Sequence, residues 1–189
     1  MSDVRKATPH RREFLADSLT PLAAYRRMRS LSGHRFLLES ISGGEQVSRF
    51  SFLGARPSQV CRVYSDRFEI EAEGSRVVEE GDPLPRLQRL LGSISAEPES
   101  IPFAGGWVGF LGYDAIRLVE RLPSRPPDPF NLPVITLARF DEIVVFDHAR
   151  QRVIAIANEI EGEVERAEAE EHLEELSALL TQSSEGGAV

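Results

Sequence analysis

Residues 58–80, SQVCRVYSDRFEIEAEGSRVVEE, hold three short β-favouring runs separated by only two or three residues. The breaks fall at Ser65-Asp66 and at Glu73-Gly74-Ser75, where turn-forming residues interrupt an alternation of apolar and polar side chains. Connections this short join antiparallel neighbours, because a parallel pair needs a crossover of about a dozen residues or more. The segment therefore predicts an antiparallel meander with one face toward solvent.

Two further pairs of strands are predicted on either side of this meander. HRFLLES, residues 34–40, and RFSFLGA, residues 49–55, are β-favouring, and the intervening Gly43 and Gly44 can take positive φ at little steric cost, so a hairpin is expected. In VITLARFDEIVVFDHARQRVIAIAN, residues 134–158, two apolar strands flank the turn sequence DHARQ. The second pair is therefore also predicted to be antiparallel.

Three helices are predicted, at about 20–31, 82–94 and 162–181. Thr20 and Asp82 are candidate N-caps, and Pro21 and Pro83 follow them at the first helical position. The predicted inward-facing residues are Leu22, Tyr25, Met28 and Leu31 in the first helix, Leu84, Leu87, Leu90 and Leu91 in the second, and Ala169, Leu173, Leu176 and Leu180 in the third.

Together these elements predict an α+β fold, with mainly antiparallel sheets and flanking helices. We expect a flexible tail over residues 1–18, a folded domain over 19–158, an acidic helix over 159–181 and a second flexible tail over 182–189. A chain of 189 residues with 41% apolar content is long enough for one such hydrophobic core.

Charge and cysteine content exclude several classes of protein. A formal net charge of −8 gives no electrostatic reason to bind nucleic acid or anionic membranes, so neither is expected as a partner. No apolar run approaches the roughly eighteen residues of a membrane span. The single cysteine, Cys61, cannot form an internal disulfide and occupies an apolar strand position. These features predict a cytoplasmic protein.

Catalytic motifs are scarce. The sequence has no HExxH, no GxxxxGK, no CxxC and no pair of histidines at metal-ligand spacing. We interpret His10, His34, His148 and His172 as surface or capping residues. Asp141, Glu142 and Asp147 flank an apolar strand and are interpreted as strand ends that meet water, rather than as an acid and base pair.

Glycines interrupt one strand-like segment, FAGGWVGFLGYD, residues 103–114. Ordinary strands avoid glycine, so either another group approaches this backbone closely or the strand bends. No helix N-terminus visibly follows, which argues against a phosphate-binding loop. A packing role is therefore predicted for Gly105, Gly106, Gly109 and Tyr113.

Five strings resemble a known family. TPLAAYRRM, FLLES, SRFSFLG, PFAGGWVGFLGYD and FDEIVVFDHARQRVIAIAN, in this order and at this spacing, resemble the N-terminal domain of anthranilate synthase component I over about residues 19–158. The same domain begins the aminodeoxychorismate synthase of the folate pathway, which therefore stays open as an alternative. The pairing of LLES with RFSFLG favours the anthranilate branch.

The resemblance implies that catalysis and regulation belong to different parts of the protein. In that family, a chorismate-using lyase of tryptophan biosynthesis, the chorismate chemistry and its magnesium-holding glutamates belong to a larger C-terminal domain. We expect this chain to lack that domain, to hold no cofactor or metal itself, and to be inactive alone. The implied partners are a chorismate-binding catalytic domain or subunit, a glutamine amidotransferase subunit that delivers ammonia, and L-tryptophan as feedback inhibitor.

The resemblance also assigns a role to FLLES, residues 36–40. It implies that tryptophan binds between this strand and the catalytic half, with Leu38 as a wall for the indole, Glu39 as an acceptor for the ammonium and Ser40 as a donor. Arg49 on the neighbouring strand is a candidate positive partner. Taken without the resemblance, Glu39 and Ser40 are simply a solvated strand end. A freestanding amino-acid-binding module without enzymatic role, and a truncated gene product without function, remain alternatives.

Overall fold

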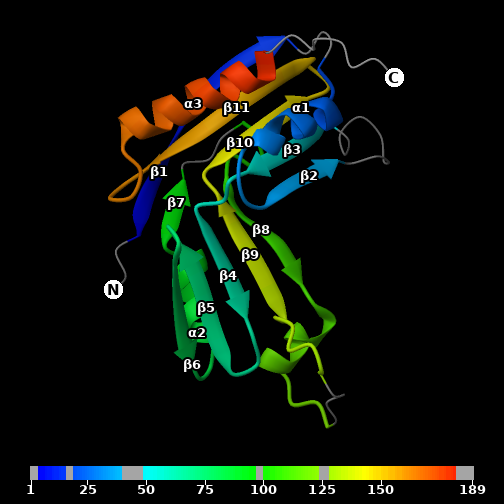
Figure 1. The fold of residues 1–189 in the computed structure, drawn as a ribbon, viewed down its shortest axis with the longest axis vertical. Coiled ribbons are helices and arrows are strands. Elements are labelled where there is room, and N and C mark those ends of the chain that lie inside the picture. The colour runs from blue at the N-terminus through cyan, green and yellow to red at the C-terminus, as the bar shows by residue number, and fades with distance from the viewer. Residues whose placement is uncertain (1–3, 16–18, 40–48, 97–99, 124–127, 182–189) are drawn as a thin grey trace.

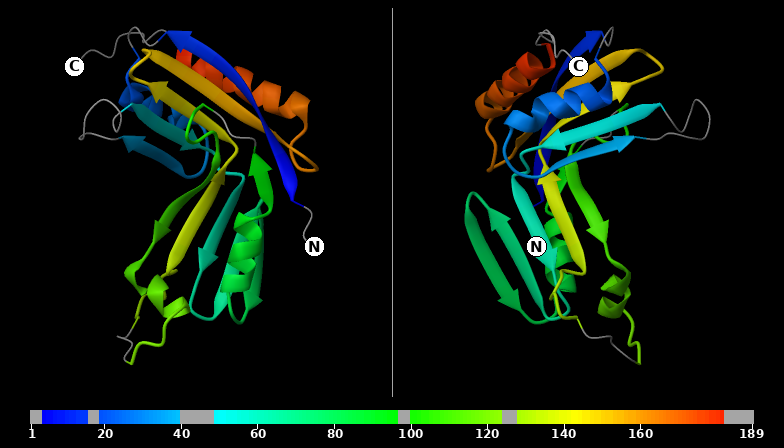
Figure 2. Two further views of the ribbon diagram at one scale, coloured as in Figure 1. Left: turned by 180° about the vertical axis from the view of Figure 1, so that it is seen from behind. Right: turned by 45° about the vertical axis from the view of Figure 1, so that its right-hand side comes forward.

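The computed structural model describes residues 4–15, 19–39, 49–96, 100–123 and 128–181. These residues form two β-sheets set at an angle to each other, with helices on their outer sides (Figures 1 and 2). All neighbouring strands pair antiparallel except β1 and β7, which are parallel. The predicted α+β fold with mainly antiparallel sheets is therefore confirmed.

The first sheet has six strands in the order β2-β3-β10-β11-β1-β7. Their bounds are Arg5–Leu15 for β1, Arg35–Glu39 for β2, Phe50–Ala55 for β3, Ile94–Ala96 for β7, Glu142–Asp147 for β10 and Arg152–Ile160 for β11. Both predicted hairpins, β2 with β3 and β10 with β11, lie in this sheet.

The second sheet has five strands in the order β6-β5-β4-β9-β8. Their bounds are Gln59–Val63 for β4, Arg67–Ala72 for β5, Ser75–Glu80 for β6, Gly106–Leu111 for β8 and Ile135–Phe140 for β9. Strands β4, β5 and β6 are the predicted meander. Only Asp141 separates β9 from β10, so what the sequence predicts as one long apolar strand passes from one sheet to the other at that residue.

Helices cover one face of each sheet. Helix α1, Pro21–Arg27, continues as the 3-10 helix η1, Met28–Ser30, and packs with α3, Arg166–Thr181, on the six-stranded sheet. Helix α2, Leu84–Leu91, packs on the five-stranded sheet through Leu87. A second 3-10 helix, η2, spans Tyr113–Leu118. Thr20 caps α1 as predicted, since its Oγ1 accepts the N–H of Ala23 at 3.2 Å.

The predicted inward faces are only partly correct. The apolar stripe of α3 is buried as predicted, and so are Met28 and Leu31. Leu22 and Leu91 are exposed instead, because α1 turns Ala24 toward the sheet and α2 packs through Leu87 and Leu90.

The predicted N-terminal tail over residues 1–18 is wrong, because Arg5–Leu15 is strand β1. Nine of its residues, Ala7 to Leu15, pair with β11. Charged side chains support the pairing: Arg152 bonds to Glu13 at 2.5 Å, and His10 lies 3.0 Å from Glu159. The predicted helix over 159–181 begins only at Arg166, since Glu159 and Ile160 complete β11. The predicted tail over 182–189 lies outside the described residues.

The two sheets meet around one apolar cluster. Val60, Ala138 and Phe140 of the five-stranded sheet pack with Ile143, Val145, Ile154 and Ile156 of the six-stranded sheet. Phe36 and Phe52 of β2 and β3 join this group, and Phe36 packs edge-on against Phe140 with ring centroids 4.8 Å apart. We call this group the junction cluster; it fixes the angle between the sheets.

Candidate functional site

Strand β2, which carries Leu38 and Glu39, is an edge strand of the six-stranded sheet. Leu38 lies opposite Phe52 and Glu39 opposite Ser51, so the two side chains point to opposite faces. Leu38, 50% exposed, is on the face of the junction cluster, whereas the exposed Glu39 is on the face that α1 and α3 cover. The structure therefore does not bring Leu38, the predicted wall for the indole, and Glu39, the predicted acceptor for the ammonium, to one face of the sheet. Ser40 lies outside the described residues.

Arg49 is engaged by a carboxylate of its own chain. Its Nε donates to Oδ1 of Asp147 at 3.0 Å and its Nη2 donates to Oδ2 at 2.7 Å. The Arg49 guanidinium also lies over the ring of Phe50. The hydrogen bonds from Arg49 hold the pKa of Asp147 below its ordinary value. Arg49 lies directly before β3 rather than on it as predicted, and Asp147 already takes its two-pronged hydrogen bonding.

The acidic residues at the ends of β10 are not solvated strand ends, which corrects the sequence-based interpretation. Asp147 is paired with Arg49, and its side chain is only 4% exposed. Glu142 is also buried: its Oε2 accepts from Nη2 of Arg56 at 2.9 Å, and its Oε1 lies 3.0 Å from Nδ1 of His172 on α3. Other segments of the chain cover both ends of β10. The two carboxylates therefore form internal ion pairs that connect β10 to the residues flanking β3 and to α3.

The glycines of β8, and Gly105 directly before it, serve close packing inside this chain. A Cβ on Gly109 would lie 2.0 Å from the backbone oxygen of Thr136 in β9, so no side chain fits there. Gly105 has φ +134°, and a Cβ there would meet the side-chain nitrogen of Asn158 at 2.6 Å. Gly106 has φ +129°. Tyr113 begins η2 just after the strand and is 92% exposed, so its predicted packing partner is not found among the described residues.

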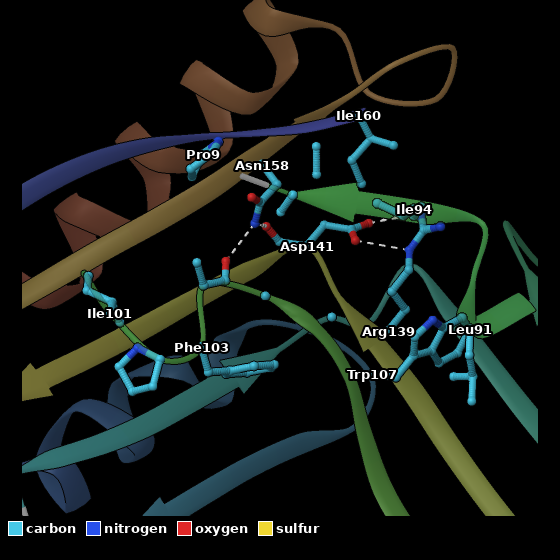
Figure 3. A pocket seen from close by; sticks show the side chains of 16 residues that line it. Pro9, Leu91, Ile94, Ile101, Phe103, Trp107, Arg139, Asp141, Asn158 and Ile160 are labelled. Carbon is cyan, nitrogen blue, oxygen red and sulfur yellow. Dashed lines mark hydrogen bonds and ion pairs between the residues drawn. The ribbon is translucent and has the colours of Figure 1, made fainter. Parts of the chain in front are cut away.

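A cavity of about 460 Å³ lies beside these glycines, where the two sheets meet. Apolar side chains form most of its lining, among them Leu91, Ile101, Phe103, Trp107 and Ile160. Figure 3 shows Trp107 and Leu91 close together, with Arg139 and Asp141 nearby and Phe103 and Ile101 on the other side. Neither Leu38 nor Arg49 lines this cavity.

The polar groups of the cavity bond to one another. Arg139 has a buried side chain; its Nε lies 3.0 Å from Asp141 Oδ1 and its Nη2 donates to Glu163 Oε2 at 2.6 Å. Asn158 Nδ2 donates to the backbone oxygens of Ala104 at 2.8 Å and of Asp141 at 2.9 Å. These contacts tie the loop before β8 to the point where β9 passes into β10, so they position the two sheets rather than offer free catalytic groups.

Sequence reasoning missed Arg139, Asn158 and the cavity. The only signal was the string ARFDE, in which charged residues interrupt an apolar strand at the change of sheet. Within the described ranges, no group of three or more histidine, cysteine, aspartate or glutamate side chains could hold a metal ion. Within those same ranges, no helix is long and apolar enough to cross a membrane.

Comparisons with known proteins agree on one family. A family model described as chorismate binding enzyme matches residues 33–188. Anthranilate synthase component 1 of Acetivibrio thermocellus is 38% identical over 159 residues, which are 82% of this chain and 32% of that protein. The protein of the same name from Thermus thermophilus is 36% identical over 155 residues, 82% of this chain and 33% of that protein.

A solved structure shows the same likeness. The crystal structure of anthranilate synthase component I from Streptococcus pneumoniae TIGR4 matches with a TM-score of 0.62 and 26% sequence identity, over 91% of this chain and 37% of that chain. This chain spans about a third of the length of the curated relatives it matches. The resemblance seen in the sequence is therefore confirmed, and the chain belongs to the chorismate binding enzyme family, in which it is similar to anthranilate synthase component I.

Proposed function

We propose that this chain is the N-terminal regulatory and scaffolding part of an anthranilate synthase component I, and that it contributes to the conversion of chorismate to anthranilate in tryptophan biosynthesis. The observation that carries the proposal is identity of 36–38% to anthranilate synthase component 1 from two organisms over 82% of the chain. The fold match to the Streptococcus pneumoniae protein supports it. The names of these relatives favour the anthranilate branch over aminodeoxychorismate synthase.

The chemistry on chorismate is proposed to belong to the polypeptide that the relatives have beyond the matched third. The buried charged side chains support this assignment, because Arg139, Glu142 and Asp147 each form an ion pair within the chain. In this account the magnesium site belongs to that other polypeptide, and a glutamine amidotransferase subunit supplies ammonia to the assembled enzyme.

Feedback inhibition by tryptophan is the regulatory part of the proposal. Leu38 supports it, because an exposed leucine on an edge strand beside Phe52 offers an apolar wall for an indole ring. Glu39 is exposed at the end of the same strand but points to the opposite face from Leu38, so its carboxylate can accept from the ammonium group only if the ligand reaches around the edge of β2. Arg49 can take part only by exchanging Asp147 for the carboxylate of the ligand.

Genetic complementation tests the pathway. A bacterial strain lacking anthranilate synthase component I would receive this chain together with the unmatched two-thirds of the Acetivibrio thermocellus relative, or either piece alone. We expect growth without tryptophan only with both pieces. In parallel, a strain that needs p-aminobenzoate would receive this chain with the corresponding unmatched part of an aminodeoxychorismate synthase, and rescue of that strain alone would favour the folate branch. No rescue of either strain by two well-expressed pieces would favour a non-enzymatic module.

A further inference from the structure

Strand β8 presents an unpaired edge. It is the last strand of the five-stranded sheet and, among the strands that the structure describes, it pairs only with β9. Gly112, the next residue, donates its N–H to the oxygen of Val134 at 2.8 Å. Because the peptide groups of an antiparallel strand point alternately toward the partner and away from it, those of Trp107, Gly109 and Leu111 point away from β9. The edge thus offers a row of free backbone donors and acceptors.

The two edges of this sheet differ in how they are protected. Strand β6, at the opposite edge, carries Arg76, Glu79 and Glu80, and such charges discourage pairing with another strand. Strand β8 has the sequence GWVGFL, without a charge. An uncharged, apolar edge strand left open to water promotes aggregation, so a protein that keeps one needs a partner to cover it.

Exposed apolar side chains gather next to this edge. Of the fifteen exposed large hydrophobic residues among those the structure describes, eight lie between residues 110 and 132. They include Phe110 and Leu111 at the end of β8, Tyr113 and Val119 at the two ends of η2, and Phe130 and Leu132 before β9. A concentration of exposed apolar side chains of this kind is typical of an interaction surface. Figures 1 and 2 show the backbone of β8 and η2 reaching the end of the five-stranded sheet far from α3, and β8 lies on the same side of the molecule as the edge strand β2.

We propose that β8 and these apolar side chains form the docking surface for the polypeptide that the relatives carry beyond the matched third, and that a strand of that polypeptide pairs with β8. This inference rests on the proposed function. The occupant follows from length, because the relatives are about three times as long as the match, so roughly two-thirds of each is available to cover this surface. Main-chain hydrogen bonds to Trp107, Gly109 and Leu111 would hold the added strand, and the apolar side chains would pack beside it.

Two proline variants of the full chain separate the two edges. Leu111→Pro removes an outward N–H at an exposed position, which an edge strand tolerates. Val78→Pro is the matched control on β6. The N–H of Gly81 donates to the backbone oxygen of Asp66, so the peptide groups of every second residue before Gly81 also face β5. The N–H of Val78 lies between these positions and points away from β5. The probe is the unmatched two-thirds of the Acetivibrio thermocellus relative, co-expressed with each variant and tested by pull-down and titration. We expect Leu111→Pro to weaken the complex at least tenfold and Val78→Pro to leave it unchanged.

Hydrogen exchange of the wild-type complex provides a second measurement that needs no variant. The peptide spanning residues 104–112 should exchange several times more slowly in the complex than in the chain alone, while the peptide over 75–80 should not change. A complex with neither this protection nor sensitivity to Leu111→Pro would overturn the docking surface and leave the proposed function standing. No complex at all with the wild-type chain would overturn both. A wild-type dimer that Leu111→Pro splits would assign the edge to a second copy and overturn the proposal.

Discussion

Arg49 and Asp147 form a two-pronged ion pair, with nitrogen to oxygen distances of 3.0 and 2.7 Å, that joins the start of β3 to the end of β10. The pair links one strand of each predicted hairpin, since β3 belongs to the first hairpin and β10 to the second. Asp147 thus already binds Arg49, the residue named in the sequence analysis as a candidate positive partner for tryptophan.

Because of this ion pair, the free energy of unfolding is expected to fall when the pH becomes acidic. The pKa of Asp147 is lower in the folded chain than its ordinary value of 3.8, chiefly because Arg49 hydrogen-bonds to the carboxylate. Such a group stabilises the fold above its unfolded pKa, and the contribution is lost as pH falls through the folded pKa. We therefore expect Arg49→Gln to lower the melting temperature at pH 7, with a difference from wild type that shrinks below about pH 4. Thermal unfolding followed by circular dichroism across this range checks the prediction, and Arg150→Gln, at 4.0 Å from Asp147, is the milder control. A difference that does not change with pH would contradict it.

The close approach of β8 to β9 predicts a large penalty at Gly109. Gly109→Ala places a methyl group against the backbone of Thr136 and should reduce the free energy of unfolding by about 3 kcal/mol. Gly74→Ala is the control, because Gly74 has φ +73° but open space around it, so only the backbone strain of about 1 kcal/mol is added. Urea unfolding of both variants gives the comparison. Equal losses would show that the strands can move apart to accept the methyl.

Burial predicts an unreactive thiol at Cys61. The side chain is fully buried, and loss of hydration raises its pKa to about 12. We expect no labelling by a thiol reagent in the native chain at pH 8, and labelling of one thiol per chain once guanidinium unfolds it. Rapid labelling under native conditions would mean that β4 opens readily.

The hairpins and the meander were predictable from sequence because each depends on local alternation and a local turn. Strand β1 was not, since its sequence is rich in charge and includes Pro9, and it is ordered by pairing with β11 near the other end of the chain. The burial of Glu142 and Asp147 was missed for a similar reason: their partners Arg56, His172 and Arg49 come from distant segments. Packing of the glycine segment was predicted, but the cavity beside Gly105 arises only from the angle between the sheets. The alternation of Leu38 and Glu39 to opposite faces follows from the strand period, once β2 is known to include both residues.

The regulatory part of the proposal is tested at Ser40. Ser40→Phe would place a ring where the polar end of tryptophan is proposed to lie, so tryptophan inhibition of the assembled enzyme should weaken while uninhibited turnover stays near wild type. Inhibition curves and calorimetry of both complexes give the comparison. Equal tryptophan sensitivity of two folded complexes would mean that Leu38 and Glu39 are only the end of β2.

Anthranilate formation in vitro tests the central claim most directly. This chain and the unmatched two-thirds of the Acetivibrio thermocellus relative would be purified separately and together, then given chorismate, magnesium and an ammonium salt, with anthranilate followed by its fluorescence. The account predicts anthranilate from the two pieces together and none from this chain alone. Anthranilate from this chain alone, or a stable complex of the two pieces that forms none, would contradict it.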